Sequence, residues 1–156
     1  MIKIHFTGKD GLHELTERLL YGELGHPATV LRTPEGKPYI DGNEIYFSLS
    51  HSGKKGVVAL NDSPVGVDLE YLGEREYPAV LSRFSERERQ EIFTIDDFIR
   101  HWTAKEAFIK MHGYTLASAL FNTEYFGGSI YYKGEKEPCE VTHYKLGKTG
   151  ILAICR

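Results

Sequence analysis

Two carboxylates, Asp68 and Glu70, are separated by a single residue within the stretch Pro64 to Tyr71. The apolar residues of this stretch alternate with them, which predicts a strand with Asp68 and Glu70 on one face, about 7 Å apart at their Cα atoms. For two acids alone, the exposed polar face of an edge strand is the simpler interpretation. Acidic residues are depleted in strands, however, and here they occupy two consecutive positions on the same face.

A third carboxylate, Glu106, lies in the segment Trp102 to Lys110, which has helical periodicity. It shares one predicted helical stripe with Ile95, Ile99, Trp102 and Ile109. An acid on an otherwise apolar stripe costs several kcal/mol unless something compensates it. Lys110 follows Glu106 by one helical turn and could meet a phosphate oxygen or a leaving group. The alternative is an ordinary helical ion pair between them, which would contribute a few tenths of a kcal/mol.

A divalent cation would explain all three carboxylates together. Hard oxygen ligands without a histidine or cysteine cluster favour Mg²⁺, or Mn²⁺, over zinc. Magnesium commonly binds a few carboxylates together with substrate phosphates and water. The hypothesis is therefore a site for phosphate chemistry formed by Asp68, Glu70 and Glu106.

Two further segments carry candidate phosphate ligands. Lys37 lies in Thr33 to Pro38, a loop in which two prolines flank a glycine, and taken alone it is most simply a solvated lysine. Ser50 and His51 stand at the open end of a predicted hairpin. Adjacent residues of a strand point to opposite faces, so this pair suits phosphate binding better than nucleophilic catalysis. Two surface residues at a turn remain an equally good interpretation.

The elements that would position these residues follow from periodicity and capping signals. The sequence predicts a strand over 2–6 and a helix from Asp10 that glycines end, followed by the hairpin 45–60. It then predicts a turn or short helix over 77–84 and a helix from the capping box at Ser85 through Phe93, whose charges we interpret as solvated. The next helix should begin at Asp96 or Asp97 and end at Gly113. Strands are expected over 116–126, 129–133, 141–146 and 151–155, as antiparallel sheet.

Length and composition place the chain among ordinary folded proteins. Its 156 residues are enough for one domain or for two small halves that share a core. A net charge of -3 without a long basic run argues against a general nucleic-acid binder. The sequence shows no membrane-spanning stretch and no signal-peptide core, so we expect a cytoplasmic protein with no membrane partner. Cys139 and Cys155 are expected to be reduced thiols.

Four segments in this order resemble a known family. The pair Val65 to Glu70 and Trp102 to Lys110 is similar to the paired signature of the 4′-phosphopantetheinyl transferases. Phe47 to Ser52 and Gly36 to Pro38 resemble two further motifs of the larger, surfactin-synthetase-activating type. The resemblance implies an α+β fold of two similar halves around a central cleft, each half a small antiparallel sheet with a long helix. Residues 1–64 would form the N-terminal half, on the 3′-phosphate side of coenzyme A, and residues 65–156 the half with the metal site and catalytic helix.

The resemblance also implies roles for the candidate residues in the second half. Asp68, Glu70 and Glu106 would hold Mg²⁺, or Mn²⁺, on the pyrophosphate of coenzyme A. Glu106, directly or through water, is the candidate base for the incoming serine. Lys110 is the candidate that stabilises the leaving phosphate.

Coenzyme A contacts are implied for residues of both halves. Lys37, Ser50 and His51 would contact its 3′-phosphate, and Lys105 another phosphate oxygen. Where larger family members carry a basic helical segment after the first strand, this chain has Thr7 to Gly11.

The implied reaction transfers phosphopantetheine from coenzyme A to a serine of an apo acyl or peptidyl carrier protein and releases 3′,5′-ADP. A coenzyme A-binding paralogue without transferase activity is the alternative, and a structural or interaction protein with relic carboxylates is a third possibility. We expect a monomer that binds a carrier protein and no nucleic acid.

Overall fold

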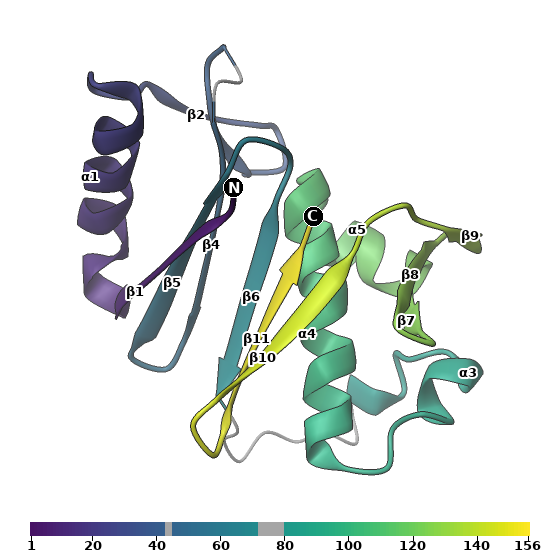
Figure 1. Ribbon diagram of the computed structural model, residues 1–156. Coiled ribbons are helices and arrows are strands. Elements are labelled where there is room, and N and C mark those ends of the chain that lie inside the picture. Colours follow the sequence, from purple (N-terminus) through teal and green to yellow (C-terminus); the bar gives the residue numbers. More distant parts are fainter. Residues whose placement is uncertain (43–44, 72–79) are drawn as a thin grey trace.

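The computed structural model describes residues 1–42, 45–71 and 80–156. Up to residue 61 the elements are β1 (Lys3–Gly8), η1 (Lys9–Gly11), α1 (Leu12–Leu24), β2 (Val30–Arg32), β3 (Pro38–Ile40), β4 (Tyr46–Ser52) and β5 (Lys55–Asn61). From residue 66 onward they are β6 (Gly66–Tyr71), α3 (Glu86–Arg89), α4 (Ile95–His112), α5 (Leu116–Ala119), η2 (Leu120–Asn122), β7 (Thr123–Phe126), β8 (Ser129–Tyr132), β9 (Glu135–Lys136), β10 (Val141–Leu146) and β11 (Gly150–Cys155). Small antiparallel sheets and the long helix α4 confirm the predicted α+β class (Figure 1).

The N-terminal sheet has the strand order β1-β5-β4, with all neighbours antiparallel. Helix α1 covers one of its faces, because Leu15 and Leu20 pack against Phe47, Val58 and Leu60. The helix ends at Gly25, whose φ of 74° is a left-handed conformation that glycine adopts without strain.

The C-terminal sheet has the order β10-β11-β6, and α4 packs across one of its faces. The helix approaches β6 most closely at Gly66, where an added Cβ atom would lie 1.8 Å from the carbonyl oxygen of Ala107. A glycine is therefore required here, and its lack of a side chain lets α4 lie directly on the strand that carries Asp68 and Glu70.

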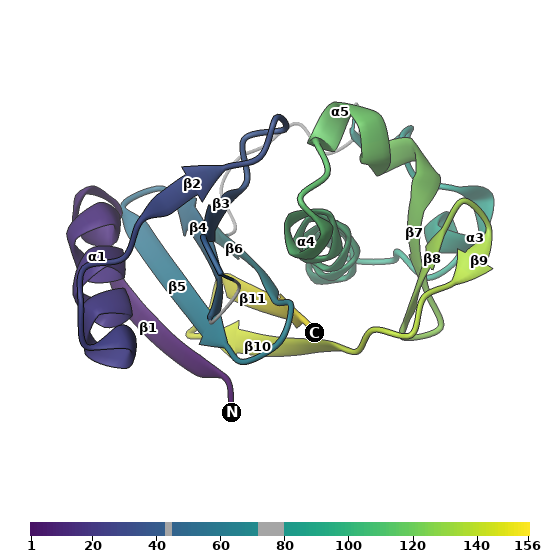
Figure 2. The same ribbon diagram turned by 90° about the horizontal axis from the view of Figure 1, so that it is seen from above.

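The two sheets share a core on the faces turned away from α1 and α4. Val57 and Ala59 of β5 meet Val67 and Leu69 of β6 and Leu152 of β11 there. The sheets adjoin at β4 and β6, which lie side by side in both views (Figures 1 and 2). This junction brings residues of the first half against the strand that carries the two acids.

Most predicted elements are present, but some differ in their bounds or type. Helix α4 begins at Ile95 instead of Asp96, since Thr94 forms a capping box with Asp97. The helix predicted from Ser85 through Phe93 is only the short α3. The strand predicted over 116–126 begins as helix α5, because the Thr115 hydroxyl accepts a hydrogen bond from the backbone N–H of Ser118.

The remaining predictions concern the segment 77–84, the loop at Lys37, the two cysteines and membrane-spanning helices. The turn or short helix expected over 77–84 lies partly outside the described residues. The short antiparallel pair β2–β3, on either side of the predicted loop at Lys37, was not expected. Cys139 and Cys155 both have free thiols. No helix in the described ranges combines the length and apolar character needed to span a membrane.

Candidate functional site

Strand β6 buries both of its acids beneath α4. Asp68 retains 2% and Glu70 7% of its possible exposure, so the exposed polar face considered from the sequence is absent. Gly66, Asp68 and Glu70 alternate with the apolar residues that enter the shared core. Buried carboxylates require partners, and those partners come from α4 and β4.

Lys110 of α4 and Ser50 of β4 meet at Asp68. The Lys110 ammonium donates to Asp68 Oδ1 over 2.6 Å, and the Ser50 hydroxyl donates to the same oxygen over 2.8 Å. Lys110 Nζ also lies 3.0 Å from Ser50 Oγ. Asp68 Oδ2, by contrast, is buried and has no hydrogen-bond partner among the described residues. A buried acceptor without a partner is costly, and a bound cation would relieve that cost.

Glu106 is the second carboxylate near the Lys110 ammonium, with its Oε2 atom 3.9 Å from Nζ. Its side chain keeps 18% of its exposure, so it is less buried than a position on the apolar stripe would be. The face of α4 that packs into the core is the one with Ala104, Ala107 and Phe108. Glu106 therefore stands at the edge of the buried face of the helix, on the same side as Lys110.

The donor set fits a magnesium site, although the carboxylates are not gathered into one. In the described part of the chain, no three His, Cys, Asp or Glu side chains are close enough together to hold a metal ion. Lys110 instead pairs with both Asp68 and Glu106, with its Nζ atom 2.6 Å from the first and 3.9 Å from the second. Carboxylate oxygens are the ligands that Mg²⁺ prefers, and Asp68 Oδ2 is a buried oxygen whose bonding capacity is unused.

A row of three serines joins β4 to β6. Their hydroxyls accept hydrogen bonds from backbone N–H groups of β6 over 3.0 to 3.1 Å. The pairs, each donor first, are Val67 N with Ser48 Oγ, Leu69 N with Ser50 Oγ, and Tyr71 N with Ser52 Oγ. Ser52 also donates to Glu70 Oε2 over 2.9 Å. Sequence reasoning missed this row, although the alternation of serine at 48, 50 and 52 was a visible signal.

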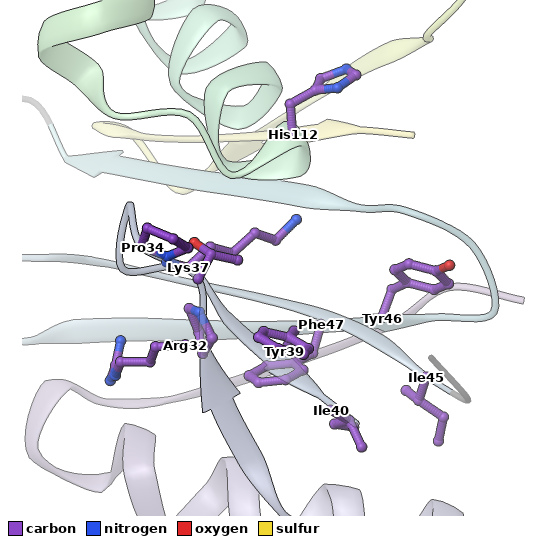
Figure 3. A pocket seen from close by; sticks show the side chains of 11 residues that line it. Arg32, Pro34, Lys37, Tyr39, Ile40, Ile45, Tyr46, Phe47 and His112 are labelled. Carbon is purple, nitrogen blue, oxygen red and sulfur yellow. The ribbon is translucent and has the colours of Figure 1, made fainter. Parts of the chain in front are cut away.

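Lys37 lies on a cavity between the two halves. A cavity of about 390 Å³ is lined by residues of β2, β3 and β4, including Arg32, and by His112 at the end of α4 (Figure 3). A second cavity, of about 280 Å³, is lined by Lys37 together with Lys110 and Tyr114. The Lys37 ammonium donates to the carbonyl oxygen of Met111, and burial lowers the pKa of this lysine. Burial likewise lowers the pKa of His112.

Ser50 and His51 point to opposite faces of β4, as the strand prediction requires. Ser50 is buried, whereas His51 is exposed and lines neither cavity. The Ser50 hydroxyl gives its one proton to Asp68 and accepts from Leu69 N and Lys110, which uses its full capacity. The structure thus brings Ser50 to the carboxylates and Lys37 to the cavity, and it does not bring the three predicted phosphate ligands together.

Lys105 is enclosed on the other side of α4. Its ammonium lies 3.1 Å from Glu88 Oε1 and 4.4 Å from the centre of the Phe84 ring, and the side chain is 1% exposed. Burial lowers the pKa of Lys105, although Glu88 opposes the shift. The structure therefore does not bring Lys105 to the phosphate site that the resemblance implied. The interpretation of the Ser85 to Glu88 charges as solvated is wrong for Glu88, which is fully buried.

Comparison with known proteins finds relatives that match the segments with the candidate site residues. The family model of the 4′-phosphopantetheinyl transferase superfamily matches residues 64–149, which include Asp68, Glu70, Glu106 and Lys110. The chain is 31% identical over 138 residues to the 4′-phosphopantetheinyl transferase psf-1 of Bacillus pumilus, covering 77% of this chain and 57% of that protein. It is 30% identical over 132 residues to a 4′-phosphopantetheinyl transferase of Bacillus subtilis, covering 77% and 59%.

A third relative is the 4′-phosphopantetheinyl transferase Sfp of Bacillus subtilis strain 168, with 27% identity over 135 residues, 77% of this chain and 59% of Sfp. The match therefore extends over less than two thirds of each of these three relatives.

Proposed function

The chain belongs to the 4′-phosphopantetheinyl transferase superfamily, and from this premise we propose that it transfers 4′-phosphopantetheine from coenzyme A to a serine of a carrier protein. The leaving product would be 3′,5′-ADP. The observation that carries the proposal is the contact of Lys110 with Asp68, whose second oxygen is buried without a partner among the described residues. This contact links the two segments that the family model matches, at the edge of a cavity between the halves.

Asp68, Glu70 and Glu106 are the proposed ligands of Mg²⁺, with Mn²⁺ as a possible substitute. The ion, when bound, would neutralise negative charge on the pyrophosphate of coenzyme A. Coordination by Asp68 would use the oxygen that has no hydrogen-bond partner and leave the oxygen held by Ser50 and Lys110 in place. The support is therefore one available buried oxygen and two further carboxylates, Glu70 on the same strand and Glu106 beside Lys110.

Lys110 and Glu106 are the proposed catalytic residues. Lys110 would stabilise the negative charge that develops on the leaving phosphate, because its side chain is 31% exposed and lines the second cavity. Glu106, 3.9 Å from that ammonium and partly exposed, would accept the proton of the incoming serine hydroxyl, directly or through a water molecule.

The cavities beside Lys37 are the proposed binding site for coenzyme A. Arg32, Lys37 and His112 supply donors there, and a phosphate would compete with the Met111 carbonyl for the Lys37 ammonium. Ser50 and His51 stay predicted ligands of the 3′-phosphate, and Ser50 would need to give up one of its present partners. The two functional halves would be residues 1–64 and 65–156, since the cavities and the serine row lie at their junction.

The acceptor would be an apo acyl or peptidyl carrier protein. The transferase itself would be a cytoplasmic monomer. The relatives named above are 4′-phosphopantetheinyl transferases, which supports the reaction class and not a particular carrier. Neither nucleic acid nor membrane has a role in the proposed reaction.

Intact-mass measurement tests the proposal. Purified protein, Mg²⁺ and coenzyme A are incubated with a panel of apo carrier proteins, and each carrier should gain the mass of one phosphopantetheine group. Carriers with the acceptor serine replaced by alanine are the control and should gain nothing. If no carrier in the panel gains this mass, the proposal is contradicted. Magnesium-dependent binding of coenzyme A by calorimetry without transfer would instead favour a coenzyme A-binding paralogue.

A further inference from the structure

The serine row does more than join two strands. Strands β4 and β6 run in the same direction, with Ser48, Ser50 and Ser52 each accepting from a β6 N–H group nineteen residues later. The hydroxyls thus take the place that carbonyl oxygens have in an ordinary parallel ladder. Successive members lie two residues apart and therefore on one face of β4.

Each hydroxyl that accepts from an N–H still has one proton to donate. At two of the three positions, this proton goes to the carboxylate of the residue just before the bonded N–H. Ser50 accepts from Leu69 N and donates to Asp68, and Ser52 accepts from Tyr71 N and donates to Glu70 Oε2 over 2.9 Å. At the first position the preceding residue is Gly66, which has no carboxylate.

We propose that Ser52 is a positioning residue for the metal site, which fixes the orientation of Glu70 through its hydroxyl; this rests on the proposed function. The hydroxyl is itself held by the β6 backbone, so it acts as a fixed donor and restricts where the Glu70 carboxylate can turn. Ser52 and Glu70 are both buried, which keeps water from replacing the contact. Partners of this kind around metal ligands usually change metal affinity by about 10- to 100-fold.

Ser48 provides a matched control within the same row. It is buried like Ser52 and accepts the same kind of N–H bond over 3.0 Å. The residue before its bonded N–H group is Gly66, however, so Ser48 has no neighbouring carboxylate to orient. If Ser52 acted only as a link between strands, Ser52→Ala and Ser48→Ala would have the same effects. If it positions Glu70, only Ser52→Ala should weaken metal binding, and it should also cost more stability than Ser48→Ala because Glu70 loses a donor.

The test is Mn²⁺ binding to the purified full chain, measured by electron paramagnetic resonance and by competition with Mg²⁺. Ser52→Ala should weaken Mn²⁺ binding about 10- to 100-fold, whereas Ser48→Ala should leave it within about threefold of the wild type, below that range. Ser52→Thr keeps the hydroxyl and should restore most of the affinity. If Ser52→Ala does not fold, Ser52→Cys serves, because a thiol is only a weak hydrogen-bond donor.

Transfer kinetics supply a second readout. Ser52→Ala should raise the Mg²⁺ concentration needed for half-maximal transfer and leave kcat at saturating Mg²⁺ near that of the wild type. Equal Mn²⁺ affinities for Ser52→Ala and Ser48→Ala would overturn the inference, as would a wild type that binds no Mn²⁺. A wild type that binds Mn²⁺ but modifies no carrier would refute the proposed function alone, since the affinity comparison would still decide the role of Ser52.

Discussion

Helix α4 carries two lysine–carboxylate pairs that differ in how completely the protein satisfies them. Lys105 and Glu88 are 1% and 0% exposed, and Glu88 also accepts from Ser85 N and Tyr125 N. Both oxygens of Glu88 are thus occupied inside the protein. Lys110 is 31% exposed, and its partner Asp68 has one oxygen without a partner in the described structure.

The difference separates a structural ion pair from a candidate binding site. A buried pair whose remaining hydrogen bonds are all made can hold elements together, here α3 and β7 against α4. An equally buried carboxylate with an unused oxygen beside a cavity has capacity for a ligand. Residue type, helix and distance are similar in the two pairs, so the surroundings determine the role.

The largest expected effect is on stability, from Lys105→Met. It leaves Glu88 buried without its cation and should lower the free energy of unfolding by about 3–5 kcal/mol. Lys110→Met should cost less, about 1–3 kcal/mol, because Lys110 is partly solvated and the buried Asp68 keeps its hydrogen bond from Ser50. Urea denaturation of both variants measures the difference. The double variant Lys105→Met, Glu88→Gln should recover part of the loss, and equal costs for the two lysines would remove the distinction.

The next effect is on activity, from Asp68→Asn. The amide keeps the size of the side chain but removes the charge proposed to bind Mg²⁺, so transfer should fall roughly 100-fold or more, about 2.7 kcal/mol of transition-state stabilisation. Stability should change little. Glu88→Gln is the opposite control, with lowered stability and retained activity in the folded fraction. A fully active Asp68→Asn enzyme would show that the unpartnered oxygen has no functional role.

A smaller effect is expected where α4 touches β6. Gly66→Ala places a methyl group against the Ala107 carbonyl, and relief of that overlap should move α4 and cost about 1–3 kcal/mol. Gly22→Ala on α1 is the control, since nothing lies within 4 Å of its added Cβ and the change should stabilise by about 0.5–1 kcal/mol. Urea midpoints measure both. A neutral Gly66→Ala would mean that the helix does not need this contact to hold Lys110 over Asp68.

The last prediction is a pH dependence of stability that arises at His143. Burial lowers the pKa of His143 from 6.5 to about 4, and its ring contacts the Arg100 carbonyl oxygen over 2.9 Å. The unfolded chain therefore binds a proton more readily, so stability should fall as pH drops from about 6.5 to about 4. The free energy of unfolding of His143→Gln should fall less over this range. Parallel pH curves for the two proteins would contradict the prediction.

Local patterns predicted the elements that carry the site. The alternation around Asp68 placed both acids on one face of a strand, and Gly113 ended α4 at its left-handed C-cap. The spacing of one helical turn also suggested, as the alternative interpretation, the contact of Lys110 with Glu106 that the structure shows. Periodicity and capping act over a few residues, which is why one sequence suffices to detect them.

Contacts between distant segments could not be predicted in this way. The burial of Glu88 depends on Tyr125 of β7, and the role of Ser50 depends on β6 lying beside β4. A capping glutamate and a serine at the end of a hairpin are also common on protein surfaces. Packing therefore decided which charged and polar residues became enclosed.

The position of β6 between β4 and β11 also affects how the protein can fold. The strands β1, β4 and β5 and helix α1 all lie before residue 62, so the N-terminal sheet can form early during synthesis. The backbone ladder of β6 needs β11, where Glu70 pairs with Ile151. Until β11 has been translated, the edge of β6 lacks this backbone partner. Long-range strand pairing of this kind is slow, and unpaired strand edges are prone to aggregate. The acids of the candidate site thus reach their final environment only after nearly the whole chain has been synthesised.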